Sequence, residues 1–158
     1  MQRAGLRFAS LRGASAPVLD PAVPATFRCS IVTPSQSILS ADANYVSFEA
    51  WDGQRGVMAG ASPFLASLGV GVAKVELADG ASKTFIVDSG FAQMRGNELT
   101  LVADYAEDAA GINRAAAERD YAEVKAKAVE TGHTSAEERQ KIERSQRLAA
   151  TRIALARG

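Results

Sequence analysis

Hydrophobic and polar residues alternate with a period of two from Thr26 to Asp104. In the first run, Phe27, Cys29 and Ile31 occupy one set of alternate positions, and the segments 45–50 and 98–104 repeat the pattern. Successive side chains of a β-strand point to opposite faces, so each run predicts a short strand with one buried face.

Turn sequences separate these runs. Asp79-Gly80 and Gly96-Asn97 are typical of tight hairpin turns. The run 70–77 changes phase, which predicts a bulge or bend at Ala73-Lys74. Gly90 is expected to divide the run that follows into two strands. About eight short strands in so few residues predict an all-β flattened sandwich or barrel over residues 26–105.

Residues 106–158 have a different character, because Ala, Glu, Lys and Arg predominate and favour helices. Gly132 is expected to close a first helix, and Ser135 with Glu138 forms a capping box for a second. The break at 131–134 is short, so the two helices are expected to form an antiparallel hairpin. Their apolar faces are narrow and rich in alanine, so the hairpin is expected to dock weakly and to be able to leave the sandwich.

Residues 1–25 differ from both regions. Arg3, Arg7 and Arg12 precede the first acidic residue, Asp20, as is typical of an organelle targeting segment. Several prolines block regular structure, so a disordered extension explains the same segment. Both interpretations stay open.

Composition narrows the classes of function. The 158 residues hold 18 basic and 18 acidic side chains, which argues against a nucleic-acid-binding protein. Hydrophobic residues make up 47%, enough for a core, and no apolar run approaches the ~18 residues of a membrane span. The single cysteine, Cys29, and the single histidine, His133, exclude a disulfide framework and a Cys/His zinc site.

Catalytic patterns are missing from the sequence. It has no Gly-x-Ser-x-Gly elbow and no phosphate-binding loop. A hydrolase with paired carboxylates is an alternative, but most acidic residues of the strand region are expected to be solvated at turns or outward positions. They are Asp42, Glu49, Asp52, Glu76, Asp79, Asp88, Glu98 and Asp104. The pattern favours a protein without catalytic residues, cofactor or metal.

Charge is uneven along the hairpin. Residues 134–158 hold six basic residues against three acidic ones. A solvated face with pairs such as Glu143 and Arg147 explains this, and so does a basic helix that meets an acidic partner. The candidate residues for such a partner are Arg139, Lys141, Arg144, Arg147 and Arg152.

Three blocks identify a family resemblance. They are FRCSIVTPSQSIL at 27–39, WDGQRGVMAGASPFLASLGVG at 51–71 and TFIVDSGFAQMRGNELTLVAD at 84–104. In this order, followed by a helical hairpin, they resemble the epsilon subunit of F-type ATP synthases, which is called delta in mitochondria. The third block is the most specific.

The resemblance implies a non-catalytic rotor subunit of the central stalk of a proton-translocating ATP synthase. It implies coupling between the gamma subunit and the membrane ring, peripheral association with the membrane, and a hairpin that restrains ATP hydrolysis through transient contact with the alpha and beta subunits. It implies the cytoplasmic face of a bacterial inner membrane, with the matrix side of the mitochondrial inner membrane as the alternative. The implied ring and gamma interface comprises Asp52, Gln54, Arg55, Met58, Ser62, Phe64 and Leu65.

The resemblance leaves two points to consider: ATP binding and a competing class of function. Some bacterial members of the family bind ATP through an Ile-Asp-x-x-Arg-Ala motif, where this chain reads INRAAA at 112–117. Asn113 replaces the acid and Ala116 the arginine, so we expect no useful ATP binding. The competing class of function is a free-standing β-sandwich that binds another protein, with the helices as a tether.

Overall fold

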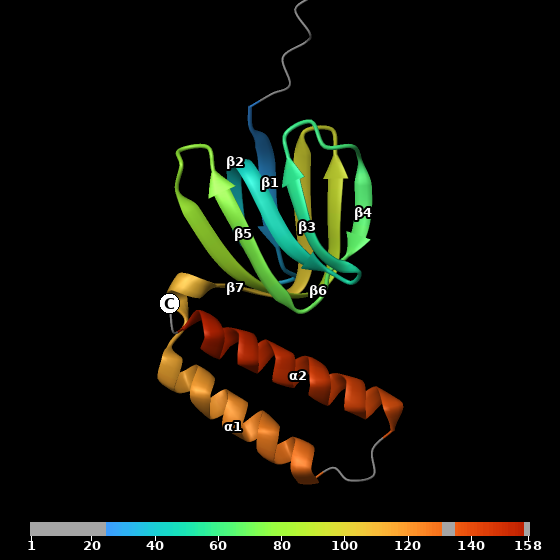
Figure 1. Cartoon of the computed structure of the whole chain (residues 1–158), viewed down its shortest axis with the longest axis vertical. Coiled ribbons are helices and arrows are strands. Elements are labelled where there is room, and N and C mark those ends of the chain that lie inside the picture. Colours follow the sequence, from blue (N-terminus) through green and yellow to red (C-terminus); the bar gives the residue numbers. More distant parts are fainter. Residues whose placement is uncertain (1–24, 131–134, 157–158) are drawn as a thin grey trace, which may run out of the picture.

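The computed structural model describes residues 25–130 and 135–156. Seven strands are followed by a short 3₁₀ turn and two helices, as Figure 1 shows. The predicted fold class, an all-β sandwich or barrel with a C-terminal helical hairpin, is confirmed. The elements are β1 (Phe27–Val32), β2 (Ser37–Ala50), β3 (Gly53–Met58), β4 (Phe64–Ser67), β5 (Gly71–Leu77), β6 (Ser82–Arg95), β7 (Glu98–Asp108), η1 (Ala109–Gly111), α1 (Arg114–Glu130) and α2 (Ala136–Leu155).

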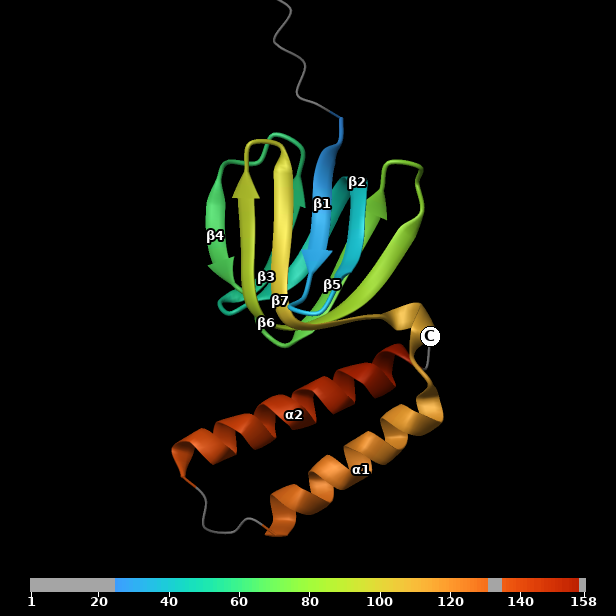
Figure 2. The same cartoon turned by 180° about the vertical axis from the view of Figure 1, so that it is seen from behind.

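The strands form one sheet that closes into a flattened barrel. Its order is β1-β7-β6-β5-β2-β3, and an additional pairing of β1 with β2 closes it. The β1–β7 pair is parallel, while the other pairs are antiparallel. The long strand β6 runs through both layers: its first half pairs with β5 and its second half pairs with β4. Figures 1 and 2 show the two layers from opposite sides.

The core lies between these layers and follows the predicted alternation. Phe27, Cys29 and Ile31 of β1 are buried, as expected. The inward sets predicted for 45–50 and 98–104 are confirmed by the buried residues Val46, Phe48, Ala50, Leu99, Leu101 and Ala103. Strand alternation therefore accounts for the interior of the sandwich.

One expected phase change is wrong. The β5–β6 register is regular from Gly71 to Glu76, so β5 has no bulge at Ala73-Lys74. Ala73 is fully buried and continues the inward phase, while Val72 lies on the outer face and is half-buried. The register shift instead lies in β2, between Ala43 and Tyr45.

The expected division at Gly90 is also wrong, because β6 is continuous through this residue. The strand bends there, and Ser89 and Gly90 both have positive φ, 55° and 103°. Before the bend, Phe85 and Val87 belong to the core. After it, Ala92 does, so the inward positions change from odd to even numbers. The pairing of β6 with β7 continues through the bend, so one strand replaces the two that the sequence suggested. The sheet therefore has seven strands where about eight were expected.

The helices lie at one end of the sandwich. In both views α2 lies between the sandwich and α1, and the two helices pack as antiparallel neighbours. The predicted capping box is confirmed: the Ser135 hydroxyl accepts from the Glu138 amide at 3.3 Å, and the Ser135 amide donates to the Glu138 carboxylate at 3.0 Å.

The remaining expectations on the ends and the helix break concern residues 1–24, 131–134 and 157–158, which lie outside the described residues. They include the N-terminal extension, Gly132 and His133. No helix of the described residues is long and apolar enough to cross a membrane.

Candidate protein-binding surface

The turn between β2 and β3 is held by an ion pair. Arg55 donates to the Asp52 carboxylate from Nη2 at 2.7 Å and from Nε at 3.3 Å. The hydrogen bond from Arg55 lowers the pKa of Asp52, and the same bond raises the pKa of Arg55. The guanidinium also lies 5.9 Å from the centre of the Phe64 ring, a cation–π distance. The turn therefore presents an exposed pair of opposite charges.

The residues predicted for the interface fall into two groups. Asp52, Arg55 and Leu65 line one shallow hollow of about 340 Å³, together with Trp51. The side chain of Phe64 lies beside them, under Arg55. The exposed Gln54 stands between Asp52 and Arg55 in sequence, at the start of β3.

The second group lies at the other end of β3. Met58 is the last residue of this strand and is 60% exposed. Ser62 is exposed in the connection from β3 to β4. Asp52 and Met58 are six positions apart, roughly 20 Å along a strand, so the two groups extend along the whole length of β3 and do not form one compact site at the turn.

Three large exposed apolar side chains extend the first group and were not predicted: Trp51, Phe91 and Val102, which are 80%, 53% and 48% exposed. Phe91 pairs with Val102 across β6 and β7, and with Ser67 of β4. The Trp51 amide donates to the Ser67 carbonyl at 2.9 Å.

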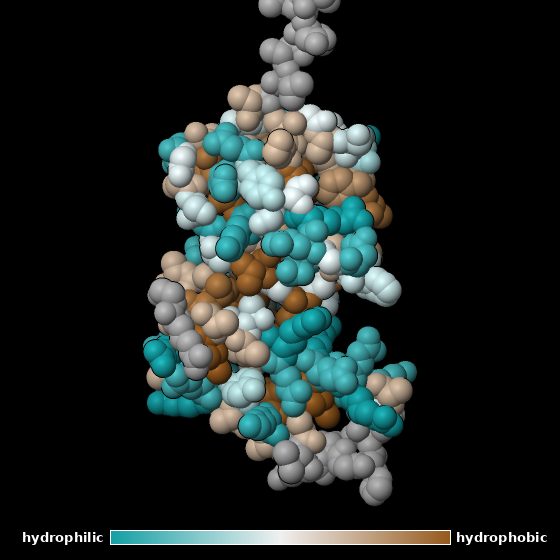
Figure 3. Space-filling model, in the orientation of Figure 1, coloured by the Kyte–Doolittle hydropathy of each residue, from teal (hydrophilic) through white to brown (hydrophobic). Residues whose placement is uncertain are grey.

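These contacts place the four side chains of the side patch, which we define as Trp51, Leu65, Phe91 and Val102, over neighbouring strands and one turn. Figure 3 shows hydrophobic surface at the edge of the sandwich where Figure 1 places β4. Large aromatic and aliphatic residues that gather on a surface indicate a protein-binding site. Val102 could have been found from the sequence, because it is apolar in the outward phase of β7.

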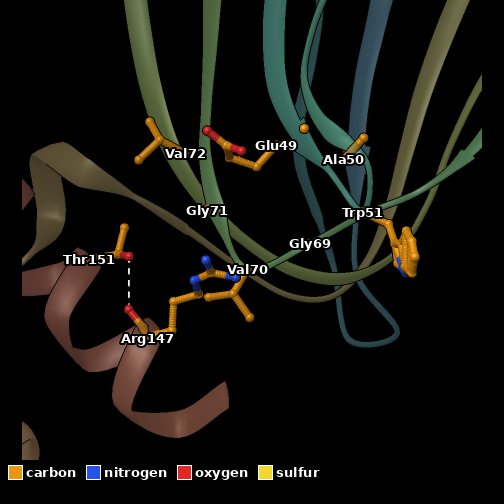
Figure 4. Close-up of a pocket in the computed structure, with 10 residues that line it drawn as sticks. Glu49, Ala50, Trp51, Gly69, Val70, Gly71, Val72, Arg147 and Thr151 are labelled. Atoms are coloured by element: carbon orange, nitrogen blue, oxygen red, sulfur yellow. Dashed lines mark hydrogen bonds between the residues drawn. The ribbon is translucent and has the colours of Figure 1, made fainter. Parts of the chain in front are cut away.

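The candidate residues on α2 have different environments. Arg144 and Arg152 contact acidic residues of this same chain. Arg139 and Lys141 are exposed near the start of α2. Arg147 points from α2 toward the β4–β5 connection in Figure 4, where it lines an open groove of about 490 Å³ with Glu49. The sequence did not indicate which of these arginines bind within the chain.

Arg144 binds a carboxylate that the alternation placed in solvent. Its Nε donates to both oxygens of Asp88, at 2.8 and 2.9 Å, and its Nη2 donates to Asp104 at 3.4 Å. Asp88 is only 4% exposed, contrary to the expectation for the acids of this region. The hydrogen bond with Asp88 raises the pKa of Arg144.

Arg152 connects three elements. Its Nε donates to Glu107 of β7 at 3.0 Å, and its Nη1 binds Asp120 of α1. Burial lowers the pKa of Arg152, but the hydrogen bond and charge of Glu107 outweigh it, so this pKa rises. The Tyr105 hydroxyl donates to the same carboxylate at 2.6 Å. Burial, followed by this hydrogen bond, raises the pKa of Tyr105 to about 12.

Other reactive groups add no chemistry to these surfaces. Cys29 is buried in the core, and burial raises the pKa of its thiol to about 12, so the thiolate is disfavoured. Within residues 25–130 and 135–156, no three His, Cys, Asp or Glu side chains are grouped to hold a metal ion.

The fold and its surface define a β-sandwich with a docked helical hairpin and an exposed apolar patch, a class of protein suited to binding other proteins. Residues 26–109 match the family model of the ATP synthase delta/epsilon chain β-sandwich domain. The chain therefore belongs to the ATP synthase delta/epsilon chain family.

Epsilon chains from several lineages are similar to this chain in sequence. The sodium-ion-specific ATP synthase epsilon chain of Propionigenium modestum is 35% identical over 61% of this chain and 69% of its own length. The chloroplastic epsilon chain of Guillardia theta is 34% identical over 62% and 74%. The epsilon chain of Bacillus subtilis is 34% identical over 59% and 70%.

Solved structures show the same fold. A chain of the Euglena gracilis mitochondrial ATP synthase, solved with OSCP, F1 and the c-ring, superposes with a TM-score of 0.72 at 18% identity. The superposition covers 97% of this chain and 98% of that chain, so it includes the hairpin as well as the sandwich. A chain of the Tetrahymena thermophila central stalk and c-ring assembly gives 0.54 at 15% identity, over 80% and 95%.

Proposed function

We propose that this ATP synthase subunit is a non-catalytic rotor component of the central stalk, which couples the gamma subunit to the membrane ring. The observation that carries the proposal is the side patch, because it exposes apolar area on a rigid layer of the sandwich in a member of this family. A rotor contact must transmit torque, and strands hold side chains more rigidly than loops do. We assign the side patch to the gamma subunit.

The β2–β3 turn is the proposed contact with the ring. Asp52, Gln54 and Arg55 lie at one end of the sandwich, and Asp52 and Arg55 form an ion pair there. Trp51 belongs to both surfaces, since it lines the same hollow as Asp52 and Leu65. Met58 and Ser62 lie at the opposite end of β3, so we propose them for a more distant part of the gamma contact.

Membership of the ATP synthase family supports a location at a membrane. We propose peripheral association through the complex at the cytoplasmic face of a bacterial inner membrane, with the mitochondrial matrix side as the alternative. N-terminal sequencing of the mature subunit from its native complex distinguishes the two, since removal of a segment near residue 25 supports the organelle.

Phe91→Asp tests the gamma assignment. Phe91 is 53% exposed, and its change places a charge in an apolar contact. We expect gamma binding to weaken at least tenfold, as for a residue near the centre of an interface (at least ~1.4 kcal/mol). Binding of the full-length chain to purified gamma subunit measures the effect, and circular dichroism checks the fold.

Lys74→Asp is the matched control. Lys74 is an exposed strand residue on β5 that lies outside the side patch, and its change places the same carboxylate there. The assignment fails if both variants bind gamma as the unchanged chain does, or if Lys74→Asp is the more damaging.

A further inference from the structure

The outer face of β6 is covered by the hairpin just before the strand bends. Ile86 and Asp88 alternate with the core residues Phe85 and Val87, so they point away from the interior of the barrel. Both are nevertheless buried, at 0% and 4% exposure, on the strand against which α2 and η1 pack. A carboxylate is rarely buried unless it is paired, so the partner of Asp88 decides how this contact is held.

Arg144 is that partner, and the backbone is shaped to present Asp88 to it. The arginine binds both carboxylate oxygens, and the Ser89 hydroxyl donates to Oδ1 at 3.0 Å. Ser89 has a φ of 55°, in the left-handed region that costs a serine about 1 kcal/mol or more. In this strained conformation, the Ser89 hydroxyl holds the Asp88 carboxylate in place.

Arg152 forms further ion pairs near the C-terminal end of α2. Arg152 lies about two turns after Arg144 and binds Glu107 at the end of β7 and Asp120 in α1. The side chain of Arg152 is only 19% exposed. This contact therefore ties β7, α1 and α2 at one point, while Arg144 ties the middle of α2 to the bend of β6.

Few apolar side chains of α2 are fully buried. Ala149 is the only buried residue of this helix, which the structure describes in full. Its methyl group buries little area, and each Å² of buried apolar surface contributes only about 25 cal/mol of free energy. Ile142, Leu148, Ile153 and Leu155 are half-buried and add apolar contact. The arginine pairs supply the directional contacts that specify this docked position.

We propose that Asp88 and Arg144 form a latch that sets the docked population of the hairpin, with Arg152 as a second tie. The latch is a property of the isolated chain and goes beyond the proposed function, since it does not depend on any partner. It has a consequence for partners: Arg144 and Arg152 are engaged by acids of this chain while the hairpin is docked. An acidic partner reaches them only after the latch opens, so the sandwich and the partner compete for the same guanidinium groups.

The latch is tested by measuring the distance between spin labels on the two parts of the full-length chain. Ser82→Cys on the sandwich and Ser145→Cys on α2 provide exposed labelling sites. The native Cys29 is fully buried and stays unlabelled. Pulsed electron spin resonance then gives the ratio of undocked to docked hairpins from the distance distribution.

Arg144→Gln is expected to raise this ratio about tenfold, because the docked state then covers an Asp88 carboxylate that has lost a charged hydrogen bond of ~1.5–3 kcal/mol. Asp88→Asn is expected to raise it similarly. In the double variant the two effects are expected not to multiply, because each change removes the same pair. Arg144→Gln alters an exposed helix position and so keeps the test valid if Asp88→Asn impairs folding.

Arg147→Gln is the matched control. Arg147 lies one turn from Arg144 on the same helix, has no ion pair within the described part of the chain, and is expected to change the ratio less than twofold. Equal effects of Arg144→Gln and Arg147→Gln overturn the latch, as does an unchanged ratio in Arg144→Gln or a double variant whose effects multiply. Loss of gamma binding in Phe91→Asp concerns the proposed function and leaves the latch intact.

Discussion

Gly90 is the residue on which the bend of β6 depends most. Its φ of 103° lies in a region that favours glycine, and the position faces the neighbouring strand at close range. A Cβ built on Gly90 would lie 2.9 Å from the carbonyl carbon of Val102 and 3.0 Å from Cα of Ala103, and closer still to the carbonyl oxygen of Val102. All of these are backbone atoms of β7, which cannot turn away as a flexible side chain can.

Gly90→Ala is therefore expected to cost two separate amounts of free energy. The positive φ costs an alanine about 1 kcal/mol, and moving β7 aside breaks ladder hydrogen bonds, for roughly 3 kcal/mol more. A total of about 4 kcal/mol is a large part of the 5–15 kcal/mol that such domains have. We expect the midpoint of urea unfolding, followed by circular dichroism, to fall strongly with little change in slope.

Gly80→Ala separates the two amounts. Gly80 has a φ of 87°, but a Cβ there meets nothing within 4 Å. Only the backbone strain remains, so we expect a loss of about 1 kcal/mol. If the two variants lose the same stability to within about 0.5 kcal/mol, close approach at the bend is not what requires glycine, and the reasoning is refuted.

Two further predictions concern the junction between sandwich and hairpin. The pKa of Tyr105 is about 12 in the folded chain, against an ordinary value of 10.0 for a tyrosine, so its contribution to stability is present below about pH 10 and is lost as the pH rises toward 12. Unfolding measured across this range should show a steeper loss for the unchanged chain than for Tyr105→Phe, and equal slopes would contradict the assignment. Deletion of residues 112–158 should leave a folded sandwich that binds gamma and should relieve any restraint on ATP hydrolysis in the complex; loss of assembly would contradict the two-part organisation. The cut follows η1, because β7 continues to Asp108 and pairs there with Phe85, so a cut at 106 would remove part of the sheet.

The interior of the sandwich could be predicted because alternation is a local property. Alternation within five residues of sequence predicts that Phe27, Cys29 and Ile31 share one face, and all three are buried in the structure. The phase of β5 could not be predicted in the same way. Val72 is apolar on the outer face because it lies in a strand against which α2 packs, and the sequence of the strand alone does not reveal that cover.

The surface sites were harder to predict for the same reason. Asp88 resembles any solvated acid until Arg144 is placed beside it, and the two are 56 residues apart in sequence. The sequence did predict that α2 is basic, but it could not distinguish arginines that bind within the chain from those that remain available. That distinction depends on how the hairpin docks, which is a tertiary property.

The bend of β6 connects the two surfaces. The strand carries Asp88, under the hairpin, and Phe91, in the side patch, only three residues later. The positive φ values between them reverse the inward phase, so that Phe91 points outward while Ala92 enters the core. With a regular strand through this point, Phe91 would continue the inward set of Phe85 and Val87 and the patch would lose its central ring. The bend therefore exposes the ring proposed to meet the gamma subunit, and it directly follows the carboxylate that holds α2. A change such as Gly90→Ala is expected to weaken hairpin docking and gamma binding together.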